Sequence, residues 1–217
     1  VCDDSTFLRR VYLDGLGFPP TPEEAREFLA ECETERAGLR TAGPAVKARA
    51  QLVERLLQRP EFGDFWVVKW ADLLRAEERS LDPEGMQALY GWLRESFRQN
   101  KPMDQFVREL LTSTGSTYDS PAASYYRRTR TPDLLAETTA QLFMGVRMAC
   151  AKCHNHPYDR WKQSDYHALA AYFARVGRET KHKPRRQRFD AEEINGDEFV
   201  VLRSTGEWMN PATGEPM

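Results

Sequence analysis

Apolar side chains recur every three or four positions through most of the first two-thirds of the chain, and Pro and Gly separate one such stretch from the next. This spacing is typical of amphipathic helices, and almost no stretch shows the strict alternation of a strand. The stripes predict helices around residues 7–12, 22–29, 46–57, 62–74, 86–97 and 106–111. We therefore expect a mainly α fold, built as an array of several helices.

Local signals sharpen some of these boundaries. The sequence Thr21-Pro22-Glu23-Glu24 combines a helix N-cap, a proline at the first helical position and a glutamate at the third. Residues 112–130 are polar and small, which predicts a long loop. Further helices are expected from Thr131 and from Ser164 or Asp165.

The last forty residues have a different character. A basic stretch near Arg185 precedes an apolar run at 198–203 and a glycine turn at Gly206. This order predicts a small C-terminal β-hairpin appendage. We interpret 1–178 as a helical domain and 179–217 as a basic loop with that hairpin. The basic stretch either steers an acidic partner or is a solvated loop.

Charge and composition exclude some classes of function. The chain has 217 residues, with 31 basic and 33 acidic side chains and a formal net charge of -2, so no overall field attracts nucleic acid. No apolar run reaches the length of a membrane span, and we expect no direct membrane insertion by this segment. Of the four cysteines, Cys2 and Cys32 either pair or stay as single thiols, and the other two share one motif.

That motif, Cys150-Ala-Lys-Cys153-His154, carries the candidate chemistry. Its order is the one that covalent haem attachment requires, with two thiols for the porphyrin edge and a histidine beneath the iron. Zinc is the alternative, since two thiolates and neighbouring imidazoles at this spacing also suit that metal. A thioredoxin-like redox pair is less favoured, because no strand precedes the motif.

The residues around the motif closely resemble a known family. The resemblance lies in segments 4–24, 52–57, 70–75, 106–111 and 139–161, and it runs from the N-terminus to about Arg178. The chain is similar to the planctomycete cytochrome c domain family, large helical domains with a CxxCHxHP motif in exported proteins. The resemblance implies one covalent haem c, and further domains in a longer chain. It favours haem over zinc.

Several side chains near the motif are candidate haem contacts. We expect His154 to be the proximal iron ligand, and His156 to hydrogen-bond a propionate or backbone, or to be a structural histidine. Tyr158, Arg160 and Trp161 either contact the haem edge or pack structurally. His167 is the first candidate for the distal iron ligand, with a surface histidine as the alternative. The remaining distal candidates are Met86, Met103, His182 and Met209.

The function expected first is that of a c-type cytochrome with a single haem, transferring electrons with a redox partner protein. The location is expected to be the periplasm or another exported space, where thiols can meet haem. A haem enzyme or gas-binding module is the second hypothesis, with an open distal site lined by the loop before Arg130. The third is a structural zinc-binding domain that uses the same Cys and His residues. The sequence does not decide whether the protein is an enzyme.

Overall fold

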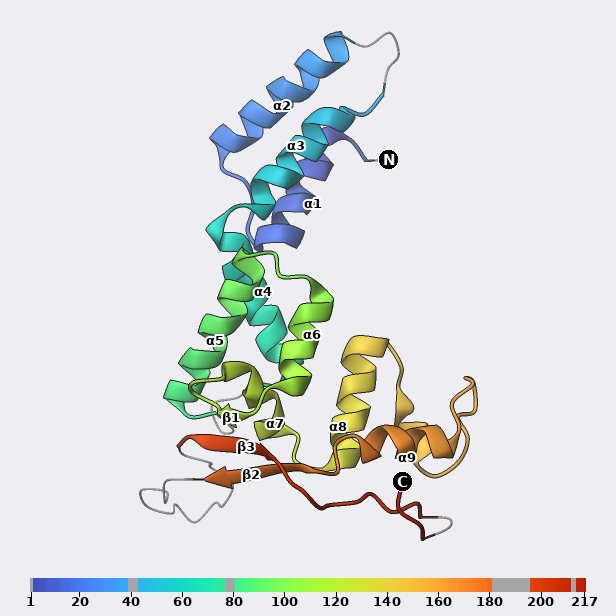
Figure 1. Ribbon diagram of the computed structural model, residues 1–217. Coiled ribbons are helices and arrows are strands. Elements are labelled where there is room, and N and C mark those ends of the chain that lie inside the picture. The colour runs from blue at the N-terminus through green and yellow to red at the C-terminus, as the bar shows by residue number, and fades with distance from the viewer. Residues whose placement is uncertain (1, 39–42, 77–80, 181–195, 212–213) are drawn as a thin grey trace, which may run out of the picture. The chain divides into compact units, whose positions relative to one another are not determined.

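The computed structural model describes residues 2–38, 43–76, 81–180, 196–211 and 214–217, and its fold is mainly α (Figure 1). Helices dominate these residues, and a small antiparallel sheet lies near the C-terminus, so the predicted fold class is confirmed. No helix among them combines the length and apolar character needed to cross a bilayer. The chain divides into two compact units, Val1–Trp70 with Leu93–Lys101, and Ala71–Trp92 with Pro102–Met217.

The first unit is helical. It contains α1 (Asp4–Leu16), α2 (Pro22–Ala37), α3 (Val46–Leu57), most of α4 (Pro60–Leu73) and the last turns of α5 (Pro83–Arg98). The apolar stripes of the first three helices meet in one core, whose buried members include Leu8, Phe28 and Leu52. These helices therefore form because packing stabilises their apolar faces.

Two helix ends in this unit follow directly from the sequence. The Thr21 hydroxyl accepts a hydrogen bond from the Glu24 backbone N–H, and the Glu24 carboxylate accepts one from Thr21, which confirms the predicted capping box. Helix α1 ends at Gly17, whose φ of 81° lies in the left-handed region. A side chain there would also meet Phe65 at 2.5 Å, so the position requires glycine.

Cys32 is fully buried in this core, and Cys2 is half-buried. Both thiols are free, so the two residues do not pair in the structure. Burial raises the pKa of the Cys32 thiol.

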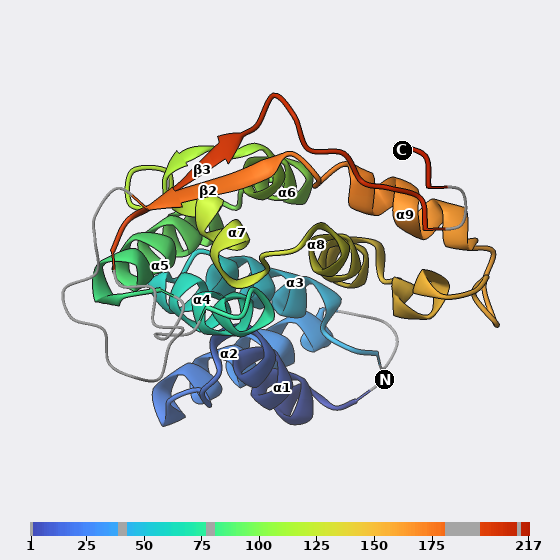
Figure 2. The ribbon, with the colours of Figure 1, turned by 90° about the horizontal axis from the view of Figure 1, so that it is seen from below.

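The second unit combines a small sheet with short helices and also contains most of α5. Its other helices are α6 (Met103–Thr112), η1 (Pro121–Ser124), α7 (Tyr125–Arg128), α8 (Pro132–Thr139), η2 (Ala140–Met144), η3 (Met148–Lys152) and α9 (Gln163–Ala171). The strands are β1 (Gly115–Ser116), β2 (Val176–Thr180) and β3 (Glu198–Leu202). Helices α8 and α9 lie side by side, and the chain after β3 runs along α9 (Figures 1 and 2).

Strand β3 lies in the middle of the sheet, between β1 and β2. It pairs antiparallel with β2, Arg178 facing Val200, and with β1, Gly115 facing Val200. The prediction that the 198–203 run pairs with the segment after Gly206 is therefore wrong, because its hairpin partner is β2. The predicted boundary at residue 178 falls inside β2, and whether the two parts behave as separate domains stays a prediction.

Residues 112–130 were predicted to be one long loop, and the structure differs. They form β1, η1 and α7, and most of their side chains from Ser116 to Thr129 are buried. Their centre is Arg127, whose side chain is fully buried, 3.5 Å from a carboxylate oxygen of Asp82 and 3.8 Å from one of Glu198. Polar composition misled the prediction because buried ion pairs and hydrogen bonds inside the unit offset the burial of these side chains.

Candidate functional site

The cysteine motif lies between two helices, as predicted. Helix α8 continues into the π-helical turn η2, which ends at Gly145 in the left-handed conformation, φ 66°. The chain then turns into η3, a short 3₁₀ helix that contains Cys150, with Cys153 as its C-cap. The helix before the motif therefore does not lead directly into it, because the turn at Gly145 intervenes.

The 3₁₀ geometry explains why both thiols face outward. In this helix residues three apart lie on the same side. Met148 and Ala151 are buried, and they pack in a core with Ala140 and Tyr166. Cys150 and Cys153, also three apart, lie on the other side, and both are free and exposed.

The motif turn is attached to the helices on either side of it. The Lys152 ammonium lies 2.8 Å from a carboxylate oxygen of Asp133, in the first turn of α8. This hydrogen bond raises the pKa of Lys152. The side-chain amide of Gln163, the first residue of α9, donates to the Lys152 carbonyl oxygen at 3.1 Å. Cys150 and Cys153 therefore belong to a turn held from both sides.

His154 is exposed, and one of its ring nitrogens already has a partner. Its Nδ1 lies 2.7 Å from the backbone carbonyl oxygen of Asn155. A carbonyl oxygen can only accept a hydrogen bond, so in this contact Nδ1 carries the proton. The neutral ring then has its lone pair on Nε2, which is the form of imidazole that binds a metal.

His156 has the opposite tautomer. Its Nδ1 accepts a hydrogen bond from the Tyr158 backbone N–H at 3.3 Å, which leaves the proton of the neutral ring on Nε2. Its own backbone N–H donates to the Trp161 carbonyl oxygen at 2.8 Å. This geometry suits a side chain that donates a hydrogen bond, and the predicted contact with a propionate stays a prediction.

The other predicted haem contacts lie in the same loop. Tyr158 is 94% exposed, so its ring extends into solvent. The Arg160 guanidinium lies over the Trp161 ring, 5.2 Å from its centroid, and Trp161 packs against the core of the motif turn. The structure thus gives Arg160 and Trp161 a shared packing role, and their contact with haem stays a prediction.

His167, the first distal candidate, is buried, so the surface alternative is wrong. Trp208 covers it: the indole N–H donates to His167 Nδ1 at 3.1 Å, and the two rings stack with centroids 6.1 Å apart. The proton of the neutral ring therefore lies on Nε2, which has no hydrogen-bond partner among the described residues. As an iron ligand His167 would first have to lose the bond from Trp208.

The other distal candidates are spread over several elements. Met103 and Met209 are exposed, Met86 is half-buried, and His182 lies outside the described residues. Among the residues that the structure describes, no three His, Cys, Asp or Glu side chains are gathered as a metal site.

Part of the predicted basic stretch has a structural role. The Arg178 guanidinium, on β2, donates to the backbone carbonyls of Tyr126, Thr129 and Arg130. Burial, and then the nearby charge of Arg130, lowers the pKa of Arg178. Arg178 is therefore not a solvated steering charge, and most of the stretch, residues 181–195, lies outside the described part of the chain.

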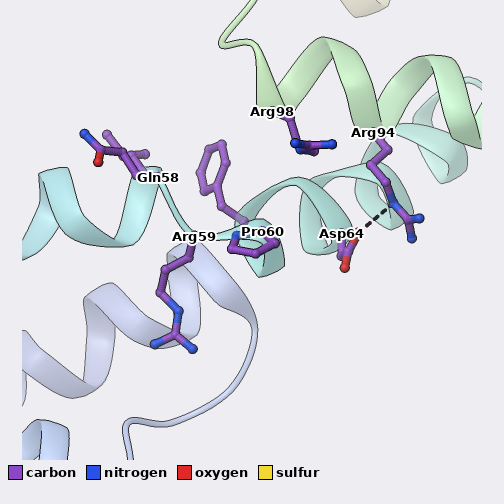
Figure 3. Close-up of a pocket in the computed structure, with 8 residues that line it drawn as sticks. Gln58, Arg59, Pro60, Asp64, Arg94 and Arg98 are labelled. Atoms are coloured by element: carbon purple, nitrogen blue, oxygen red, sulfur yellow. Dashed lines mark ion pairs between the residues drawn. The ribbon is translucent and has the colours of Figure 1, made fainter.

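A cavity of about 350 Å³ in the first unit is a second place to look for a ligand (Figure 3). Three arginines line it, and each guanidinium has a carboxylate neighbour at 2.6–3.5 Å: Arg59 has Glu24 and Glu61, Arg94 has Asp64, and Arg98 has Glu95. These partners balance the positive charge, so the lining does not indicate an anion site.

Comparison with known proteins identifies the family of the chain. The model of the PSCyt2 family, described as a protein of unknown function (DUF1549), matches residues 1–178. The chain belongs to the PSCyt2 family. The family carries the name of a planctomycete cytochrome-like domain, and the match includes the whole cysteine motif with the helices on both sides. No curated protein and no solved structure matches the chain. The PSCyt2 match ends inside β2, before the β3 strand that completes the sheet.

Two residues that the sequence did not single out make hydrogen bonds around His154 in the candidate site. Asn155 accepts hydrogen bonds through its backbone carbonyl and through its side chain. Gln163 donates to Lys152, before His154 in the chain, and to Asn155, after it. A weak signal was present, since an Asn follows the histidine of the motif directly and a Gln begins the next helix. Which atoms they bind depends on the fold of the loop.

Proposed function

We propose that this chain is a c-type cytochrome domain that carries one covalently attached haem and transfers electrons. Cys150 and Cys153 would attach the haem, and His154 would bind its iron from the proximal side. One observation carries the proposal: the two thiols lie exposed on the same side of a 3₁₀ turn, and the next residue is a histidine whose Nδ1 is occupied. The family name supports it.

The side chains present fit such a group. Each thiol would add across a vinyl group, its sulfur bonding one carbon and its hydrogen going to the other, so that no electron is gained or lost. Both thiols are exposed and without a disulfide, as this addition needs. His154 has Nε2 free for the iron, with Nδ1–H held by a backbone carbonyl. The bound haem would supply a one-electron ferric–ferrous couple.

The first alternative, a haem enzyme or gas-binding module, was expected to have an open distal site lined by the loop before Arg130. Within the segment 112–130, expected to line that site, most side chains from Ser116 to Thr129 are buried in the second unit. The structural zinc-binding domain needs three or four converging donors, whereas a c-type haem needs the two thiols and one imidazole. These features support electron transfer as the first proposal.

The proposal includes a place and partners. Thiols and haem are joined in an exported space such as the periplasm, so the domain would work there. Its electrons would pass to or from a redox partner protein, or to other domains of a longer chain.

Expression with and without the haem-attachment machinery tests this proposal. We expect a denaturing gel to show haem peroxidase activity at the mass of the chain, and Cys150→Ser with Cys153→Ser to abolish it. Cys2→Ser is the matched control, because this cysteine lies outside the motif, and it should retain the stained band. An unstained wild-type band from cells with the machinery would refute the cytochrome, and stoichiometric zinc in that protein would establish the zinc alternative.

Visible spectra of the attached protein then separate electron carrier from open haem site. An electron carrier with two axial ligands should show the same reduced spectrum with and without carbon monoxide. A reduced spectrum that shifts at low carbon monoxide concentration would favour the haem enzyme or gas-binding module.

A further inference from the structure

The loop that carries His154 makes few packing contacts, because most of its residues are exposed. Residues 152–160 are exposed apart from the half-buried His156, and they lie between the motif turn and α9. An iron ligand on such a loop needs hydrogen bonds to fix its ring, because packing alone does not hold it. The contacts that do so meet at Asn155 and Gln163.

Asn155 accepts hydrogen bonds through its backbone and through its side chain. Its backbone carbonyl accepts the hydrogen bond from His154 Nδ1 at 2.7 Å, and its side-chain Oδ1 accepts one from the Gln163 backbone N–H at 3.1 Å. That N–H belongs to the first turn of α9 and has no partner within the helix. Asn155 therefore caps α9 from eight residues away while it holds the ring of His154.

Gln163 completes the connection from the helix side. Its side-chain amide donates to the Lys152 carbonyl oxygen at 3.1 Å, while its backbone N–H is bound by Asn155. The two bonds tie the chain on both sides of His154 to one residue. A ring held in this way has a restricted set of orientations.

Helix α9 is held in place by burial and by a hydrogen bond to α8. Tyr166 is fully buried, and its hydroxyl donates to a Glu137 carboxylate oxygen on α8 at 2.7 Å. The Asp165 carboxylate accepts from the Lys162 backbone N–H at 2.8 Å, which fixes the start of the helix. The loop is thus connected to an element that packs against α8.

We infer that Asn155 and Gln163 are positioning residues that hold His154 for the iron by tying its loop to the first turn of α9. This inference rests on the proposed haem function. The hydrogen bond to the Asn155 carbonyl keeps the His154 ring in the tautomer that binds metal and fixes the direction of Nε2. Without the side-chain tie, the carbonyl moves with the loop and the iron–imidazole bond weakens.

Acid titration of the haem-loaded protein measures this weakening. Protons compete with iron for His154, so the visible spectrum changes at the pH where the ligand leaves. Loss of an outer-shell partner typically costs about 10- to 100-fold in affinity. Tenfold weaker binding raises this midpoint by about one pH unit. We expect Asn155→Ala and Gln163→Ala each to raise it by that amount or more.

Conservative variants separate positioning from general damage. Asn155→Asp keeps an oxygen acceptor and places a carboxylate at the start of α9, where it is favourable, so the midpoint should stay near the wild-type value. Gln163→Glu keeps the shape of the side chain but removes its donor, so it should behave like Gln163→Ala. Ser164→Ala is the matched control, since this residue is exposed in the same turn.

The protein without haem gives an independent readout. Hydrogen exchange of the Gln163 amide should become faster in Asn155→Ala and should stay unchanged in Ser164→Ala. Equal midpoints for wild type, Asn155→Ala and Ser164→Ala would overturn the inference, and so would an Asn155→Asp midpoint as high as that of Asn155→Ala. A failed haem stain would refute the cytochrome itself, whereas attached haem with unmoved midpoints would refute only the positioning role.

Discussion

Replacing Arg127 by Met should destabilise the second unit by about 3 kcal/mol. The Arg127 side chain is fully buried, and its guanidinium is the cation shared by the carboxylates of Asp82 and Glu198, at 3.5 and 3.8 Å. It also donates to the Thr117 hydroxyl at 3.3 Å and to the Gly196 carbonyl at 3.1 Å. Methionine is similar in length and has no charge, so the substitution leaves two buried carboxylates without their common partner.

The magnitude follows from what each carboxylate keeps. Removing one member of a buried ion pair typically costs about 3–5 kcal/mol. Asp82 still accepts hydrogen bonds from Tyr118 and from two backbone N–H groups, and Glu198 still has the Arg130 guanidinium at 2.7 Å. These remaining partners place the expected cost at the lower end of the range. A cost of about 3 kcal/mol corresponds to an equilibrium constant for unfolding that is raised on the order of 100-fold.

The free energy of unfolding of the variant should also depend less on pH in the acid range. Burial by itself raises the pKa of Asp82, but hydrogen bonds from Gly85, Tyr118 and Gly196, with the charge of Arg127, bring it below its ordinary value. A lowered folded-state pKa contributes stability above the unfolded pKa of about 4, and this is lost as the pH falls through the folded value. Without the cation the folded-state pKa of Asp82 rises toward the unfolded value, so this contribution, and its loss on acidification, should be smaller.

Urea denaturation at pH 7 measures the cost, with Arg128→Met as the matched control. Arg128 is the exposed neighbour in the same short helix, and a surface substitution there should cost less than about 0.5 kcal/mol. A cost below 1 kcal/mol for Arg127→Met, or equal costs for the two variants, would show that the buried charges do not depend on Arg127.

Three further predictions concern other parts of the chain. Gly17→Ala should lower the free energy of unfolding by about 2 kcal/mol or more, because the φ of Gly17 is positive and Phe65 fills the space beside it. Gly15→Ala should raise the free energy of unfolding by about 0.5–1 kcal/mol, because Gly15 lies inside α1 with open space around it. Melting temperatures that change in the same direction in both variants would contradict this. In protein without haem, iodoacetamide should alkylate exposed Cys150 far faster than Cys32, whose burial raises its pKa, and peptide mass spectrometry would detect equal rates if this is wrong. Trp208→Phe removes the donor to a buried imidazole and should cost about 1–3 kcal/mol in urea denaturation, so an unchanged midpoint would argue against that hydrogen bond.

The elements that could be predicted are those fixed by local chemistry. The capping box at Thr21 and Glu24 formed as expected because its donors and acceptors lie three residues apart. The helices on either side of the motif likewise follow from apolar spacing and from the proline that begins α8. Within the site, the motif itself was evident, because its chemistry lies in five consecutive residues.

The features that could not be predicted depend on partners far along the chain. Arg127 looks like an exposed residue in a polar stretch, and its burial depends on Asp82 and Glu198. His167 looks like a surface histidine until Trp208, 41 residues later, covers it. Strand β1 has only two residues and no pattern to detect. The tie between Asn155 and Gln163 was missed because side-chain acceptors do not reveal in sequence which amide they will bind.

The central position of β3 has a consequence for the order of folding. Thr117, next to β1, binds Asp197, 80 residues later, so a long loop must close before the sheet can form. As the chain is synthesised, the cysteine motif and both of its helices are complete before β3 emerges. Pairings of such long range form slowly. The sheet and the ion pairs around Arg127 should therefore form after the helices that flank the cysteine motif.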